Sequence, residues 1–161
     1  MKFVFFFPLT NRDNRHKVSP PLSLLACAAP LLGKGIEVEV IDARVEPDYR
    51  DKVLEAMEDA DLFGVSSMTG YQIADGLEVS RAVKERFPER PIVWGGYHPS
   101  LLPAQTVEAS SIDIVVRGQG EEACLKLADH LQDGLALAEI DGLTYLDGGV
   151  PASTPANSIR D

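Results

Sequence analysis

The stretch that decides the fold is "PIVWGGYHPS", residues 91–100. Its apolar first part is typical of a buried strand, and this strand ends directly in Gly95 and Gly96. Two glycines leave the last turn of the strand without side chains, so a ligand or another stretch of backbone can approach it closely. The residues that follow are large or stiff: Tyr97, His98 and Pro99. The combination is typical of a loop in which a ligand or another chain segment approaches the backbone at the end of a strand.

Strands and helices alternate on both sides of this stretch. Apolar runs predict five strands, at residues 2–7, 36–42, 62–67, 91–94 and 112–116. Apolar residues at helical spacing predict helices at residues 20–33, 48–60, 71–87 and 121–131. In the third of these, Ile73, Leu77 and Val83 fall on one face, which we expect to be buried. The alternation implies an α/β fold, a flavodoxin-like doubly wound five-stranded parallel sheet with strand order 2-1-3-4-5.

The end of the chain has a different character. Two short strand-like pieces flank "LDGGV" at 146–150, which is a hairpin signal. We therefore expect an α/β domain over residues 1–138, and a C-terminal β-hairpin with the start of a linker over residues 139–161. The chain is expected to be a piece of a longer protein. The hairpin is expected to pack loosely, because its neighbour would be absent.

Composition limits the partners and the compartment. The 161 residues are 45% hydrophobic, which is enough for the core of one domain, and the formal net charge is −10. A nucleic-acid partner needs a clustered basic face, and a membrane span needs about 20 consecutive apolar residues, so neither partner is expected. Cys27 and Cys124 have no metal-binding or disulfide-framework spacing and are interpreted as two packed thiols of a cytoplasmic protein.

In a sheet of this kind, ligands bind beyond the carboxyl ends of the strands, near the point where the strand order reverses. The loop after the first strand lacks the glycine-rich turn of a dinucleotide site, and Thr10 alone does not make a flavodoxin phosphate loop. The loops after the next strands are rich in small residues: "SSMTGY" at 66–71, "GGYHPS" at 95–100 and "RGQGEE" at 117–122. Each could be an ordinary turn, but together they predict a broad trough with exposed backbone, suited to a large ligand rich in amides.

Several segments, in order along nearly the whole chain, resemble a known family. They are "PPLSLLACAAPLLGKGIEVEVIDA", "GVSSMTG", "WGGYHPSLLPAQTV", "DIVVRGQGEE" and "IDGLTYLDGG". They strongly resemble the amino-terminal cobalamin-binding domain of cobalamin-dependent radical S-adenosylmethionine (SAM) enzymes. The pairing of GG-x-HP with RG-x-GE is the most specific part of the resemblance.

The resemblance implies a cobalamin (B12)-binding module that is itself non-catalytic. The parent enzyme would perform methyl transfer, or a cyclisation or rearrangement such as that of a tetrapyrrole oxidative cyclase. Its radical SAM domain, with a 4Fe-4S cluster and S-adenosylmethionine, would follow the linker and be the partner of this module. The alternative is a flavodoxin-like sensor or small-ligand binding domain without cobalamin.

The resemblance also implies which residues bind the cofactor. Gly95 and Gly96 would let the nucleotide tail pass, and a valine at Gly96 is expected to block the tail while sparing the fold. The other implied cofactor-binding residues come from the four loops: Pro8, Leu9, Thr10, Asn11, Ser66, Ser67, Met68, Thr69, Gly70, Tyr97, His98, Pro99, Gly118, Gln119, Gly120 and Glu121. Two residues depart from the family pattern, namely Pro30 inside the first helix and Gln119 in place of a frequent Glu.

No protein histidine is expected on the cobalt. Some cobalamin domains carry a DxHxxG motif after the first strand, whose histidine replaces the cofactor's own base. Here two residues separate Asp13 from His16, and no glycine follows at the required spacing. His98 is interpreted as a structural hydrogen-bonding residue. The tail would therefore be extended and the cobalamin base-off, with no metal-ligating side chain in this chain.

Overall fold

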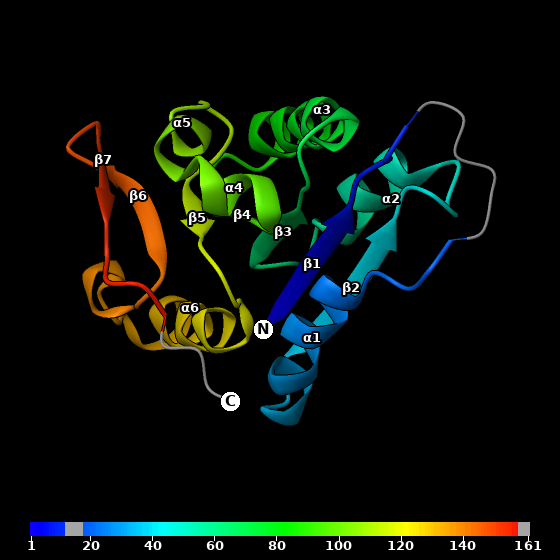
Figure 1. Cartoon of the computed structure of the whole chain (residues 1–161). Helices are drawn as coiled ribbons and strands as arrows, with labels where there is room; N and C mark the ends of the chain where they lie inside the picture. Colours follow the sequence, from blue (N-terminus) through cyan, green and yellow to red (C-terminus); the bar gives the residue numbers. More distant parts are fainter. Residues whose placement is uncertain (12–17, 158–161) are drawn as a thin grey trace.

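A computed structural model, which describes residues 1–11 and 18–157, contains one seven-stranded sheet with helices on both faces (Figure 1). The strands are β1 (Lys2–Phe7), β2 (Glu37–Asp42), β3 (Leu62–Ser66), β4 (Ile92–Gly95), β5 (Ile114–Val116), β6 (Leu143–Asp147) and β7 (Val150–Ser153). Their order is β2-β1-β3-β4-β5-β6-β7, and the first five are parallel. The predicted flavodoxin-like sheet and its strand order are confirmed.

The helices of the parallel part lie where their apolar spacing predicts them, and two short ones are additional. They are α1 (Leu22–Gly33), α2 (Tyr49–Ala56), α3 (Tyr71–Arg86), α4 (Tyr97–Leu101), α5 (Pro103–Val107) and α6 (Glu121–Asp133), with a 3₁₀ turn at Leu137–Glu139. The residues "YHPS" at 97–100 were expected to lie in a loop and instead form most of α4, and α5 follows it directly. No helix within residues 1–11 and 18–157 is both long and apolar enough to span a membrane.

The C-terminal hairpin is part of the sheet. β6 pairs antiparallel with β5, with Val116 opposite Leu143, and β7 forms the outer edge. Leu143 and Thr144 are fully buried. The expectation of a loosely packed hairpin is therefore wrong. Without β6, the backbone N–H and C=O groups at the outer edge of β5 would be unpaired, and β6 forms hydrogen bonds with them.

The pleat of the strands divides the core into two layers. On β1, Val4 and Phe6 point to the face covered by α2 and α3, whereas Phe3 and Phe5 point to the face covered by α1 and α6. All four side chains are almost completely buried. This explains why "FVFFF" is a continuous apolar run, since a central parallel strand has no solvent face.

The buried face of α3 differs from the prediction. Val83 is buried as expected, but Ile73 and Leu77 are only half-buried. The face toward the sheet includes polar side chains, which are Gln72, Asp75 and Ser80. The apolar spacing predicted the wrong face because these polar side chains are buried with hydrogen-bond partners. Ser80 Oγ accepts from the Trp94 indole nitrogen at 3.1 Å, and Gln72 and Asp75 bond to the loops after β1 and β3.

Candidate functional site

A cavity of about 220 Å³ lies between the sheet, α1 and α6. Its floor is the α1/α6 face of the sheet, where Phe5, Gly64 and Val93 are side by side in register. At the carboxyl ends of the strands it is bordered by Ser66 and Gly95. A mostly apolar slot that ends in hydroxyl and backbone groups suits a flat, largely apolar group with a polar attachment.

Part of the predicted site lines this cavity. These residues are Ser66, Gly95, Gly96, Gly118, Gln119, Gly120 and Glu121. The other predicted residues follow β1, β3 and β4 at the same edge of the sheet without lining the cavity: Pro8, Leu9, Thr10, Asn11, Ser67, Met68, Thr69, Gly70, Tyr97, His98 and Pro99. The two sets thus form a slot and the loops around its open end.

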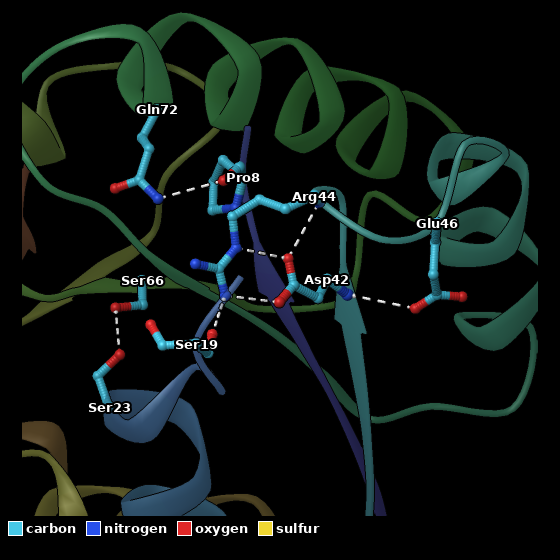
Figure 2. A network of polar contacts seen from close by, with 8 residues as sticks. All are labelled: Pro8, Ser19, Ser23, Asp42, Arg44, Glu46, Ser66 and Gln72. Atoms are coloured by element: carbon cyan, nitrogen blue, oxygen red, sulfur yellow. Dashed lines mark hydrogen bonds and ion pairs between the residues drawn. The ribbon is translucent and has the colours of Figure 1, made fainter. Parts of the chain in front are cut away.

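The serine at the end of β3 is tied to the start of α1. Ser66 Oγ and Ser23 Oγ are 3.0 Å apart and form a hydrogen bond (Figure 2). Ser23 lines the same cavity and was not among the predicted residues. No sequence signal points to it, because only the packing of α1 on the sheet brings it to the end of β3. The two hydroxyls place hydrogen-bonding groups where the slot opens.

An ion pair fixes the segment that leads into α1. The Arg44 guanidinium donates to both carboxylate oxygens of Asp42, at 2.9 and 2.7 Å, and to the carbonyl oxygen of Ser19 at 2.8 Å (Figure 2). Arg44 also lies over the Phe7 ring, 4.1 Å from its centroid. Because the side chains of Arg44 and Asp42 are about nine-tenths buried, this pair holds the chain entering α1 firmly against β1 and β2.

Two buried residues of α3 hold the loops after β1 and β3. Gln72 donates to the Pro8 carbonyl oxygen at 3.1 Å and accepts from the Met68 amide at 2.8 Å. Asp75 accepts from the Leu9 amide at 2.9 Å and from the Tyr49 hydroxyl at 2.6 Å. Since the loops have no regular structure of their own here, these side chains determine their position.

Gly96 is required by the fold. Its φ is +96°, and a Cβ at this position would lie 2.8 Å from the Ser67 carbonyl oxygen and 2.9 Å from the Ser67 nitrogen. The Ser67 amide donates to the Gly95 carbonyl oxygen, and the His98 amide donates to the Ser67 carbonyl oxygen. The prediction that Gly96→Val spares the fold is therefore wrong, because the glycine lies against the backbone of the neighbouring strand end.

The remaining loop residues are partly engaged within the protein. The Ser67 hydroxyl donates to the Met68 carbonyl oxygen at 3.0 Å, and His98 Nδ1 is 3.2 Å from Thr69 Oγ1. Met68 and Tyr97 are about 60% exposed. The contact with Thr69 agrees with a structural role for His98. His16 and Asp13 lie outside the described residues.

Two thiols meet in the cavity wall, although they are far apart in the sequence. Cys27 of α1 and Cys124 of α6 both line the cavity, and neither was predicted there. A hydrogen bond from Cys124 lowers the pKa of Cys27. The same contact, together with burial, raises the pKa of Cys124 well above its ordinary value. Among the residues that the structure describes, no group of three or more His, Cys, Asp or Glu side chains could hold a metal ion.

Curated proteins are similar to this chain in sequence. The chain is 31% identical over 149 residues to the anaerobic magnesium-protoporphyrin IX monomethyl ester cyclase of Synechocystis sp., a match that covers 88% of the chain and 30% of the relative. It is 30% identical over 166 residues to an uncharacterised methyltransferase of Pyrococcus horikoshii, covering 99% of the chain and 36% of the relative. The chain thus spans about a third of the length of these relatives.

A solved structure shows the same fold. The radical S-adenosylmethionine methyltransferase TsrM from Kitasatospora setae, with cobalamin and a [4Fe-4S] cluster bound, superposes with a TM-score of 0.78 at 24% identity. The superposition covers 99% of this chain and 30% of that one. The B12-binding domain family matches residues 9–128, which include the cavity's bordering residues and most of the loops around them. The chain therefore belongs to the B12-binding domain family.

Proposed function

We propose that this chain is the cobalamin-carrying module of a radical SAM enzyme that performs methyl transfer or a cyclisation, and that it has no catalytic activity alone. A downstream radical SAM domain, with its own 4Fe-4S cluster and S-adenosylmethionine, would be its partner. The proposal is supported by membership of the B12-binding family and by the short span relative to its cyclase and methyltransferase relatives. Two free thiols agree with a reducing compartment, the cytoplasm.

The single observation that carries the proposal is the slot between the sheet, α1 and α6. Cobalamin has a flat corrin with amide side chains and a nucleotide tail that ends in an aromatic base. We infer that the tail occupies the slot, in contact with Phe5 and Val93, and passes Gly95 at the open end. The hydroxyls of Ser23 and Ser66 would bind the polar part of the tail.

The corrin would lie over the loops outside the slot. Thr10, Asn11, Gly118 and Gln119 border the carboxyl edge of the sheet and are exposed, so they offer polar side chains and backbone groups there. These groups match the amide side chains of the corrin in hydrogen-bonding capacity. Residues 1–138 would thus be the cobalamin-binding part, with the hairpin and linker at 139–161 leading to the radical SAM domain.

Reconstitution tests this function directly. The purified chain is incubated with hydroxocobalamin and desalted, and its visible spectrum is measured. We expect about one corrin retained per chain, with no methyl transfer or radical chemistry from the chain alone. A desalted protein without corrin absorbance would exclude the cobalamin-carrying function and favour a sensor domain of the same fold.

A tail held in the slot predicts the ligation of the cobalt. The cofactor's own base would be too far away to bind the metal, and we interpret His98, whose Nδ1 lies 3.2 Å from Thr69 Oγ1, as a structural residue. We therefore expect the electron paramagnetic resonance spectrum of the Co(II) form to lack nitrogen superhyperfine splitting. Splitting that is present in the native chain and absent in His98→Ala would assign His98 as the ligand and contradict the base-off proposal. His130→Ala is the control, since His130 Nδ1 contacts the Leu135 carbonyl oxygen away from the slot.

A further inference from the structure

The thiol pair in the slot has a geometry that the cobalamin-binding function does not require. Cys27 Sγ packs against the first turn of α6, because a Cβ at Gly120 would lie only 2.8 Å from it. The Cys124 amide donates to the Gly120 carbonyl oxygen at 2.8 Å, so Cys124 lies one turn further along the same helix. Cys27 Sγ therefore lies beside the turn of α6 that carries Cys124, and both cysteines line the slot.

The surroundings of the two thiols are unequal. Cys27 is partly exposed and lies at the amino end of α6, where no side chain caps the helix and the helix dipole favours a negative charge. Cys124 is buried, and Glu121 is the nearby carboxylate that opposes ionisation of both thiols. An accessible thiol that ionises more readily, backed by a buried thiol, is the arrangement of an attacking and a resolving cysteine.

We propose that Cys27 and Cys124 form a reversible disulfide by exchange with a low-molecular-weight disulfide such as oxidised glutathione. The Cys27 thiolate attacks one sulfur of glutathione disulfide, which forms a mixed disulfide and releases one glutathione thiolate. Cys124 then loses its proton and attacks Cys27 Sγ, which releases the second glutathione. Two protein thiols are oxidised and one glutathione disulfide is reduced to two thiols, so atoms and electrons balance.

The disulfide would restrict the slot. It brings the two sulfurs to about 2.0 Å and joins α1 to α6 covalently. Both cysteines line the slot, so a fixed cross-link there would narrow the path that the nucleotide tail would take. This part of the inference rests on the proposed function. The oxidised chain is expected to take up cobalamin at least tenfold more weakly than the reduced chain.

The first experiment tests the disulfide without cobalamin. The chain contains only these two cysteines, so thiol titration and intact mass report on the pair directly. In buffers of oxidised glutathione we expect both thiols to disappear with a loss of two hydrogens in mass. Cys124→Ser should stop at a stable mixed disulfide with glutathione, and Cys27→Ser should react far more slowly. Two thiols that persist in the native chain, or a mixed disulfide as its final product, would overturn the proposal.

The second experiment measures cobalamin retention by the reduced and the oxidised chain. Weaker retention after oxidation, restored by a dithiol reductant, supports the restriction of the slot, and retention by Cys27→Ser should not respond to oxidised glutathione. Equal retention by both forms would overturn the restriction while the cobalamin-carrying function stands. If the reduced chain retained no cobalamin, both the cobalamin-carrying function and the restriction of the slot by the disulfide would be overturned. The thiol measurements would still decide whether the disulfide forms.

Discussion

Gly95→Val is expected to lower cobalamin affinity about 10- to 100-fold while the protein stays folded. A Cβ at Gly95 would meet Val116 at 3.7 Å or more, which is ordinary van der Waals contact, and no positive φ opposes it. The side chain would project to the same face of β4 as Val93, into the slot. Overpacking of a fitted site costs about 1–3 kcal/mol, which corresponds to the stated range of affinity. Cobalamin titration and thermal unfolding are measured together.

Two glycine variants provide the controls. Gly96→Val should lower the thermal midpoint, because its Cβ would clash with the backbone of Ser67. Gly33→Val adds the same side chain at the end of α1, where nothing lies within 4 Å, and should change neither quantity. If Gly95→Val bound cobalamin as tightly as the native chain at an unchanged midpoint, the slot would not be the tail site.

The parallel sheet could be predicted because the apolar composition of its strands indicates that they are buried. A run such as "FVFFF" has no polar residue. Such a run is typical of a strand that is covered on both faces, because neither set of its side chains then meets water. The pairing of the hairpin could not be predicted in this way. Turn residues such as Gly148 and Gly149 indicate that two strands meet, but not which edge of the sheet they join. The buried face of α3 was mispredicted because Gln72 and Asp75 are acceptable in the core only with partners from distant loops.

The candidate site likewise contains residues that the sequence predicts and residues that only the packing of the helices brings there. The bordering residues, such as Ser66 and Gly95, could be predicted because the carboxyl ends of parallel strands always meet at one edge. Ser23, Cys27 and Cys124 could not, because they reach the slot only through the packing of α1 against α6 and the sheet. Gly64 carried a weak signal, since a glycine inside a strand often marks a close approach. Here a Cβ at Gly64 would lie 2.7 Å from the Phe5 ring.

Asp75→Leu is expected to destabilise the protein by about 3 kcal/mol. Asp75 is 3% exposed, and its carboxylate accepts hydrogen bonds from the Leu9 amide and the Tyr49 hydroxyl, with the Arg50 guanidinium 3.6 Å away. Hydrogen bonds to a charged group each contribute about 1.5–3 kcal/mol, and a leucine removes the acceptor without admitting water. In a chain of this size the thermal midpoint should fall by roughly 6–12 °C.

The effect should extend to the cofactor, because Asp75 positions the loop that would lie beside the corrin. Asp75→Asn retains one side-chain acceptor and should recover much of the stability and most of the cobalamin retention. Asp129→Leu is the control, since Asp129 is an exposed residue of α6. Denaturant unfolding measures the stability, and desalting with hydroxocobalamin measures retention.

If Asp75→Leu and Asp129→Leu unfolded at the same midpoint, the buried carboxylate would not hold the loop. If Asp75→Leu lost stability but bound cobalamin normally below its midpoint, the loop at Leu9 would lie outside the cobalamin site.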